Sequence, residues 1–412
     1  MSLEKNADGG AGRPAPGRVE DVRRGNLVRV LASLAEARTD PDVRPTRADL
    51  AARTGLTKAS VSSLVADLVD AGLVAESGTT RDGERGRPGV GLELNSRRGV
   101  VGMEINVDYI SAGLLDLGGT LRIHRTLESG NRGQPPEAVM ALLAGLVSEV
   151  AAEASAAGTV ILGGGLAVPG LVDSASGTVA SAPNLHWRGV ALQLDRLLPD
   201  APFGTVLHNE ANCAALGELW YGHGLDFHDY LFVSGEVGVG GGLVIGSELF
   251  AGPLGQAGEV GHMVVEPSGP ECSCGGHGCL ETYAGQEAIF SEAGIPPGSP
   301  SVRLAMLGEQ LASGEAAAVS AVARAGRYLG IAAASTARLM NLSAVVLGGH
   351  FTQMGPWIAP AVVRSLADYA PGVVSPSRVA VSELGQSAAM QGAAGSSLRS
   401  VLAAPFRLTP SG

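Results

Sequence analysis

The sequence predicts an α/β fold preceded by a small, mainly helical domain. Residues 27–69 carry helical periodicity broken by a short turn, whereas later residues alternate apolar, β-branched runs that end at glycine with longer helical stretches. The 412 residues suffice for two or three domains with substantial cores. The 60 glycines follow no collagen-like period, so we expect them at tight turns and at close approaches of the backbone to ligands.

The N-terminal segment, residues 1–20, is rich in glycine, proline and charge, and we expect it to be disordered. It has no apolar segment typical of a signal peptide, and no uncharged apolar run of about 18 residues follows. We therefore expect a cytoplasmic protein without a membrane span. In that compartment the four cysteines indicate thiols or metal ligands rather than disulfides.

Residues 21–95 have the pattern of a winged helix-turn-helix. A first amphipathic helix, NLVRVLASLAEA, precedes two shorter ones that Thr46 and Thr57 can cap, with Gly55 in the turn between them. The stretches LVAES and VGLEL then read as two strands, and the segment GTTRDGERGRPG between them suits a winged hairpin. Its cationic tip, with Arg85 and Arg87, fits a minor groove.

The charge is distributed unevenly between the two parts of the chain. Residues 1–98 hold 16 Lys and Arg against 14 Asp and Glu, a net of +2, whereas residues 99–412 hold 13 against 26, a net of −13. This contrast favours DNA binding by the first part alone. The alternative is a small helical bundle with a solvated basic loop. The expected DNA contacts are Arg47, Thr57, Lys58, Ser60, Ser62, Arg85 and Arg87.

Three cysteines and nearby histidines suggest a metal site. Cys272, Cys274 and Cys279 lie within eight residues, and a disulfide between the first two would be strained and leave one thiol over. Three thiolates and one imidazole complete a tetrahedral zinc site, for which His262 and His277 are both candidates. The spacing C-x-C-x4-C is not one of the common zinc-finger spacings.

The segment GH, followed after nine residues by CSCGGHGCLE, resembles the signature of the ROK family, which groups sugar kinases with sugar-responsive repressors. GLAVPGLVD, APNLHW, NEANCAALGE, GVGGG and VVLGG follow the family's order, and the preceding helix-turn-helix resembles its repressor branch. The resemblance favours His262 over His277 and implies one structural zinc per chain, held by His262, Cys272, Cys274 and Cys279.

The resemblance also implies an actin-like, ribonuclease H-like sugar-kinase architecture for residues 99–412. A smaller lobe of about residues 99–207 plus the C-terminal helix 385–412 would close on a larger lobe of about residues 208–384, which holds the zinc loop 262–281. The sugar would lie between the lobes. Matching the family's motifs position by position gives five expected sugar-binding residues: Asn209, Glu210, Glu259, His262 and Glu281.

The sequence departs from the family's kinases in three places. EINVDY stands where the first phosphate loop resembles D-x-G-G-T-K, and EVGVGGG stands where the second resembles G-T-G-x-G-G-G. Asn106 and Val107 replace glycines, while Asp108 and Glu236 add negative charge that repels phosphate. Glu210 stands where the kinases carry aspartate as general base, and an extra methylene displaces the carboxylate by about 1 Å. We therefore expect Glu210 to bind a hydroxyl and no kinase activity.

These features together predict a sugar-responsive transcriptional regulator, most simply a repressor. Its expected partners are operator DNA, a neutral monosaccharide such as xylose, glucose or N-acetylglucosamine, and a second copy or three further copies of the chain. Two alternatives remain open at this point. One is an ATP-dependent sugar kinase joined to a DNA-binding domain, and the other is a regulator that senses a protein partner in place of a sugar.

Overall fold

The computed structural model describes residues 19–37, 44–80, 89–253 and 255–409, and it divides into two compact units. The first unit comprises the chain up to Asn95 together with residues 402–412, and the second comprises Ser96–Val401. The sequence predicted that residues 385–412 belong to the second domain, whereas residues 402–412 group with the first unit.

The first unit has three helices and a two-stranded antiparallel sheet, as the sequence predicted. The elements are α1 (Val19–Glu36), α2 (Arg47–Thr54), α3 (Lys58–Asp70), β1 (Val74–Thr80) and β2 (Gly89–Leu94). Thr46 and Asp49 form a capping box at the start of α2, and Gly55 ends this helix with a φ of 70°, which glycine adopts without strain. The periodic apolar residues are buried: Leu27, Val30, Leu31, Leu34, Val61, Leu64, Val65 and Leu68.

The C-terminal segment packs on the first helix of this unit. The short 3₁₀ helix η9 (Pro405–Arg407) contacts α1, and the guanidinium of Arg24 lies 5.1 Å from the centre of the Phe406 ring. A cation over an aromatic face at this distance is attracted by the ring quadrupole. No local pattern in the sequence predicts this contact, because Arg24 and Phe406 are 382 positions apart.

The second unit contains two five-stranded sheets with the same topology. In the first sheet the order is β10-β6-β3-β4-β5, with β3, β4 and β5 antiparallel and β6 and β10 parallel to β3. Its strands are β3 (Arg98–Ile105), β4 (Tyr109–Asp116), β5 (Leu121–Glu128), β6 (Val160–Val168) and β10 (Thr205–Asn209).

The second sheet repeats this arrangement in the order β13-β12-β11-β14-β15. Its strands are β11 (Tyr230–Gly235), β12 (Val239–Ile245), β13 (Glu248–Leu249), β14 (Ala344–Gly349) and β15 (Val379–Val381). The duplication makes the β3–β4 and β11–β12 turns equivalent, which matters for the site below. A small antiparallel sheet follows β6 and consists of β7 (Leu171–Asp173), β8 (Thr178–Ala182) and β9 (Trp187–Ala191).

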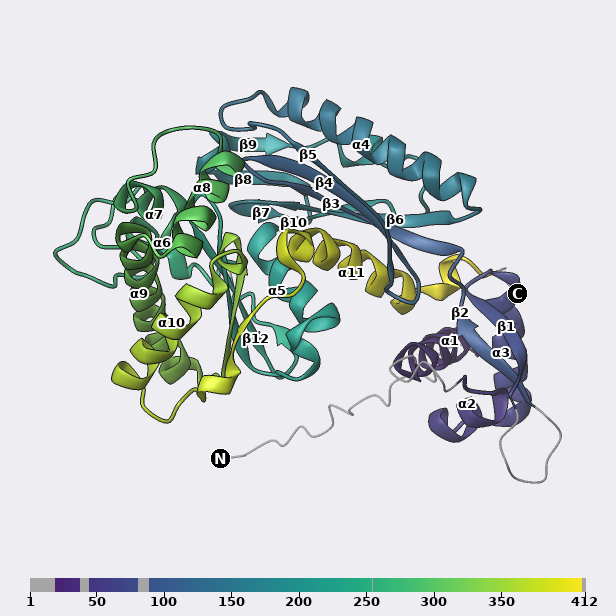
Figure 1. Cartoon of the computed structure of the whole chain (residues 1–412). Coiled ribbons are helices and arrows are strands. Elements are labelled where there is room, and N and C mark those ends of the chain that lie inside the picture. The colour runs from purple at the N-terminus through teal and green to yellow at the C-terminus, as the bar shows by residue number, and fades with distance from the viewer. Residues whose placement is uncertain (1–18, 38–43, 81–88, 254, 410–412) are drawn as a thin grey trace, which may run out of the picture. The chain divides into compact units, whose positions relative to one another are not determined.

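Helices cover both faces of the first sheet. Figure 1 shows α4 (Pro136–Ala156) along one face and α11 (Ala388–Ala403) along the other. The second sheet packs mainly against a cluster that includes the long helix α9 (Ala316–Met340) and α10 (Gly355–Tyr369). The remaining helices are α5 (Glu210–Tyr221), α6 (Glu281–Ala284), α7 (Gln286–Glu292) and α8 (Pro300–Ser313).

Helices α5 and α11 meet at glycines. A Cβ added to Gly392 of α11 would lie 1.7 Å from the carbonyl oxygen of Cys213, and one added to Gly217 of α5 would lie 2.3 Å from the carbonyl oxygen of Ala388. Only glycine permits the two backbones to approach this closely. Residues of α5 and α11 pack with residues of β6 and of the second sheet in one small hydrophobic core.

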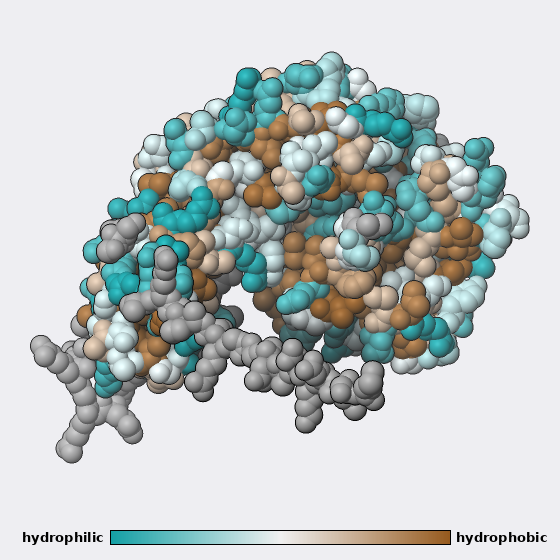
Figure 2. Space-filling model, turned by 180° about the vertical axis from the view of Figure 1, so that it is seen from behind, coloured by the Kyte–Doolittle hydropathy of each residue, from teal (hydrophilic) through white to brown (hydrophobic). Residues whose placement is uncertain are grey.

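Among the described residues, α4 alone is long and apolar enough to cross a membrane by length and composition. Core helices pass the same test, and α4 packs on the first sheet through Val139, Leu143, Leu146, Val147 and Val150. Figure 2 shows that hydrophobic residues on the face drawn there form separate patches among hydrophilic ones. Scattered apolar surface of this kind is normal for folded proteins.

Candidate functional site

The start of α3 presents the residues expected to contact DNA. Thr57 is the N-cap of this helix, and its hydroxyl accepts a hydrogen bond from the backbone N–H of Ser60 at 3.1 Å. Lys58, Ser60 and Ser62 are exposed, on the side of the helix opposite the buried Val61 and Leu64. A helix with one buried stripe and a short polar leading end can enter a major groove.

The other expected DNA contacts are Arg47 and the two wing arginines, Arg85 and Arg87. The guanidinium of Arg47 lies 2.6 Å from a carboxylate oxygen of Glu76, so Arg47 would have to exchange this partner for a phosphate. Arg85 and Arg87 lie outside the described residues, and their role stays a prediction from the sequence.

The metal-ligand candidates converge on the loop before α6. One ligand atom from each of His262, Cys272, Cys274 and Cys279 lies within 4.8 Å of the others. His262 ends the 3₁₀ helix η5 (Val260–His262), while the cysteines belong to a loop closed by the bridges Val264–Cys279 and Glu271–His277. His277 is exposed and is not a member of this group, so the loop brings together the four residues that the family resemblance favoured.

Two of the distances between these ligand atoms match a tetrahedral zinc ion. Two sulfurs bound to one zinc at about 2.3 Å and at the tetrahedral angle stand about 3.8 Å apart, and a sulfur and an imidazole nitrogen about 3.6 Å apart. The Sγ atoms of Cys274 and Cys279 are separated by 3.7 Å, and His262 Nδ1 lies 3.6 Å from Cys272 Sγ. Burial raises the pKa of Cys272 to about 12, so zinc binding there would displace a proton.

The His262 imidazole also lies beside two carboxylates. Its Nδ1 is 3.6 Å from Glu281 Oε1, and Glu281 further accepts from the hydroxyl of Ser273 at 3.1 Å. Burial raises the pKa of Glu259, the nearby His262 opposes this rise, and Glu281 adds to it. Because Nδ1 faces the cysteines, Nε2 is the nitrogen left to meet a ligand.

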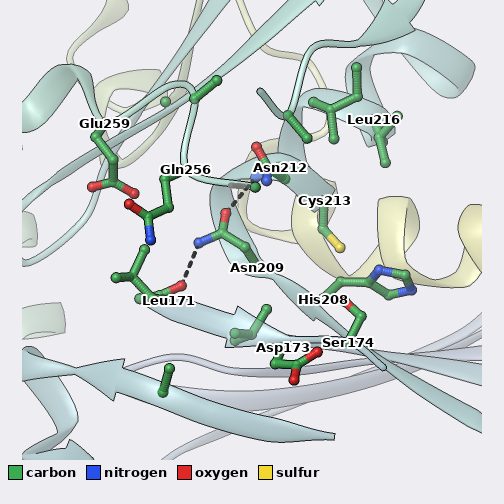
Figure 3. Close-up of a pocket in the computed structure, with 18 residues that line it drawn as sticks. Leu171, Asp173, Ser174, His208, Asn209, Asn212, Cys213, Leu216, Gln256 and Glu259 are labelled. Carbon is green, nitrogen blue, oxygen red and sulfur yellow. Dashed lines mark hydrogen bonds between the residues drawn. The ribbon is translucent and has the colours of Figure 1, made fainter. Parts of the chain in front are cut away.

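A half-enclosed cavity of about 310 Å³ lies beside Asn209, next to this loop. Asn209 is the N-cap of α5: its Oδ1 accepts from the backbone N–H of Asn212 at 2.9 Å, and its Nδ2 donates to the carbonyl of Gly170 at 2.7 Å. Figure 3 shows Glu259 and Gln256 at one end of the cavity and Leu216 and His208 toward the other. Of the five expected sugar ligands, Asn209 and Glu259 line this cavity, and the other three do not.

Glu210 belongs to a different group of side chains, at the turns of the two duplicated sheets. Asn106, in the β3–β4 turn, donates from Nδ2 to Glu210 Oε1 at 2.5 Å and to Glu236 Oε2, in the β11–β12 turn, at 3.3 Å. Asn106 Oδ1 accepts from the backbone N–H of Asp108 at 3.2 Å, which fixes the amide with its NH₂ group toward the carboxylates.

A third glutamate, Glu104, lies beside Glu210 and Glu236. We call these three glutamates the acid cluster. Glu104 is 1% exposed and accepts from Tyr109 Oη at 2.8 Å and from Ser111 Oγ at 3.4 Å. Burial raises the pKa of Glu210 to about 7 against the opposing bonds from Asn106 and Glu104. Burial and the charge of Glu210 raise the pKa values of Glu104 and Glu236 well above their usual range.

Two of these findings were not predicted from the sequence. Glu104 was not predicted as a site residue, although a glutamate inside the apolar strand VVGMEINV is unusual enough to mark it. Asn184, from the segment APNLHW, was also not predicted. A Cβ built on Gly238 would lie 2.7 Å from Glu281 Oε2 and 3.8 Å from Asn184 Nδ2. Asn184 and Glu281 therefore flank the β11–β12 turn.

Residues 100–398 match the family model described as the ROK family. This chain belongs to the ROK family. Residues 22–86 match a second model, that of the MarR family, over the three helices and the first strand of the N-terminal unit. The two-sheet unit is therefore the ROK domain, and the family assignment made from the cysteine and histidine signature is confirmed.

Curated relatives of this ROK protein include proteins named as xylose repressors and proteins named as glucokinases. It is 33% identical over 349 residues to a putative xylose repressor of Caldicellulosiruptor sp., a match that covers 81% of this chain and 85% of the relative. It is 31% identical to the xylose repressor of Bacillus subtilis, over 76% of this chain and 80% of the relative. A glucokinase of Halalkalibacterium halodurans is 32% identical and covers 56% of this chain and 74% of its own length.

Solved structures agree with the actin-like fold and the N-terminal unit. A crystal structure of a ROK family transcriptional regulator, described as a homologue of the E. coli MLC protein, has a TM-score of 0.74 and 25% identity over 94% of this chain and 98% of its own. A ROK family glucokinase from Streptomyces griseus, in complex with glucose and AMPPNP, has a TM-score of 0.61 and 27% identity over 72% of this chain and 98% of its own.

Proposed function

We propose that this ROK protein is a sugar-responsive, DNA-binding transcriptional repressor that acts in the cytoplasm. Its N-terminal unit binds operator DNA through the start of α3, and its ROK domain binds a neutral monosaccharide. The relatives named xylose repressors, which match most of the chain, support this function and make xylose the first sugar to test. As in other two-fold repressors, a homodimer or homotetramer would read two half-sites of the operator.

The negative charge around the two phosphate-loop turns favours a regulator over a kinase. The two equivalent turns, which match the phosphate loops of the family's kinases, hold Asp108 and Glu236, and Asn106 in the first turn donates to Glu236 and to Glu210 at the start of α5. Phosphate groups placed there would meet these carboxylates, and Asn106 and Val107 stand where the kinases have glycines, which disfavours nucleotide binding. We infer that Glu210 binds a sugar hydroxyl and does not act as a general base.

The sugar site would combine ligands from two places. Asn209 and Glu259 line the cavity, while His262 and Glu281 sit on the neighbouring loop and Glu210 begins the same helix that Asn209 caps. A structural zinc on His262, Cys272, Cys274 and Cys279 would hold that loop and leave His262 Nε2 as a donor to the sugar. Zinc would supply rigidity here and take no part in a reaction.

A thermal-shift screen of the purified full-length chain tests this proposal. Xylose, glucose, N-acetylglucosamine and Mg-ATP are added separately, and a ligand of the native state raises the melting temperature by mass action. We expect a shift with one of the sugars and none with Mg-ATP. A shift with Mg-ATP, together with sugar-dependent ATP consumption, would support the kinase and overturn the regulator.

A further inference from the structure

Asn106 occupies the middle of the acid cluster. It reaches Glu210 on α5 and Glu236 in the β11–β12 turn from the β3–β4 turn, so one amide joins three separate elements of the ROK domain. The turn itself is held from behind, because Asn131 Nδ2 donates to the carbonyls of Asn106 and Tyr109 at 2.7 and 3.1 Å. The Asn106 side chain is therefore fixed by its surroundings and not free to turn away.

The groups that face Glu210 supply negative charge and few donors. Glu104 on β3 and Asp108 in the β3–β4 turn face it from one sheet. The buried thiol of Cys213 faces it from α5, and Glu236 faces it from the β11–β12 turn. The donors to the cluster are the Asn106 amide and the hydroxyls of Tyr109, Ser111 and Ser234. Of the basic side chains, Arg132 acts on Asp108, and none acts on the three glutamates in the described part of the chain.

Three carboxylates without a cation cannot all stay ionised in such a place. The cluster must keep at least one proton near neutral pH, and that proton is shared among its members. The bonds from Asn106 and Glu104 favour the ionised form of Glu210, whereas burial and the charge of Asp108 favour the protonated form. Asn106 and Asp108 therefore act on the pKa of Glu210 in opposite directions.

We propose that Asn106 is a positioning residue of the sugar site, which holds the Glu210 carboxylate ready to accept from a sugar hydroxyl, and that sugar binding releases a proton from the acid cluster. This inference rests on the proposed function. A hydroxyl that donates to a carboxylate stabilises the charged form, so the sugar competes with the shared proton for Glu210. Sugar affinity falls as the pH drops through the midpoint of the cluster, by about tenfold per pH unit in the limit of one linked proton.

Isothermal titration calorimetry of the full-length chain tests whether sugar binding releases a proton. The titrant is the sugar with the largest thermal shift in the screen above, measured between pH 5.5 and 8.5 in pairs of buffers that differ in ionisation enthalpy. We expect proton release on binding near pH 7, because Glu210 titrates with a pKa of about 7 before the sugar binds. Equal apparent enthalpies in both buffers and a flat pH profile would overturn the inference.

Two variants separate positioning from a merely structural role. Asn106→Ala removes the donor and should move the pH midpoint of sugar affinity upward, whereas Asp108→Asn removes a negative neighbour and should move it downward, each by on the order of one pH unit. Glu149→Gln, an exposed glutamate on α4, is the matched control and should leave the midpoint unchanged. Circular dichroism and the melting temperature confirm that each variant is folded.

The outcomes separate this inference from the proposed function. Loss of affinity by the same factor at every pH in both Asn106→Ala and Asp108→Asn would show a structural role only and would refute the positioning role of Asn106. Sugar binding with a flat pH profile refutes the inference and leaves the repressor proposal standing. Absence of sugar binding at every pH refutes the proposed function itself, and this inference with it.

Discussion

The glycine contact between α5 and α11 predicts that Gly392→Ala destabilises the ROK domain strongly. The added Cβ would lie 1.7 Å from the carbonyl oxygen of Cys213, 2.6 Å from its carbon and 2.9 Å from the backbone nitrogen of Gly217. All three atoms belong to the backbone of α5, so no side chain can rotate away. An ordinary contact begins at 3.4 Å, and the two helices would have to separate by about half the width of a methyl group or more.

The expected loss of stability in Gly392→Ala follows from two opposing effects. Overpacking a core by one methyl group typically costs 1–3 kcal/mol, and a clash with backbone atoms belongs at about the upper end of this range or above it. Alanine is favoured over glycine in a helix by about 1 kcal/mol, which offsets part of the cost. We therefore expect Gly392→Ala to lower the free energy of unfolding by about 2 kcal/mol or more.

Urea denaturation followed by tryptophan fluorescence measures this change, because Trp220 packs against Gly395 one turn away on α11. Gly308→Ala in α8 is the matched control, since a Cβ there meets nothing within 4 Å and should stabilise the helix by a few tenths to about 1 kcal/mol. A Gly392→Ala protein with a urea midpoint equal to that of the wild type would refute the close approach of the two helices.

Three further predictions concern the separate sites. Cys279→Ser should lower zinc occupancy well below one ion per chain and loosen the His262 loop, so that sugar affinity falls with it; metal analysis that finds full occupancy would remove Cys279 from the site. Glu210→Ala should weaken sugar binding about ten- to a hundredfold, the usual cost of a lost charged hydrogen bond of roughly 1.5–3 kcal/mol, while DNA binding without sugar survives; calorimetry and DNA-binding titrations check the two parts. Lys58→Ala should weaken DNA binding and reduce the slope of its salt dependence by about one if Lys58 contacts a phosphate, whereas the control Arg188→Ala in the ROK domain should change neither; an unchanged slope for Lys58→Ala contradicts the contact.

The sequence predicted the elements of the fold because their signals are local. The capping residues Thr46 and Thr57 and the periodic apolar residues placed α2 and α3 within a residue or two, and the run AVVLGG coincides with β14. The zinc loop was predictable for a similar reason, since three of its four candidate ligands lie within eight residues.

The acid cluster could not be predicted in this way, because it depends on the duplication of the two sheets. Asn106 and Glu236 are 130 positions apart and meet only because the β3–β4 and β11–β12 turns are equivalent. The sequence showed that both residues disfavour phosphate but not that one bonds to the other. The Phe406 contact with α1 and the glycine contact of α5 with α11 were missed for the same reason, since neither has a local pattern.

The division of the sugar ligands is also a property of the fold. The motif NEAN places Asn209 and Glu210 next to each other in sequence, yet Asn209 lines the cavity as an N-cap, while Glu210 enters the first turn of α5 and turns toward Asn106. The change from strand to helix between the two residues sends their side chains in different directions. Adjacency in the motif therefore did not imply one shared surface.

The most direct test of the account is the effect of sugar on DNA binding. A DNA duplex selected by the full-length protein from a random library is labelled, and its affinity is measured by fluorescence anisotropy with and without a saturating concentration of the sugar that gives a thermal shift. The account predicts a change in DNA affinity of about fivefold or more, the usual range of coupling between two sites, and no change for Glu210→Ala at the same sugar concentration. Identical DNA affinity with and without bound sugar, accompanied by ATP-dependent phosphorylation of that sugar, would contradict it.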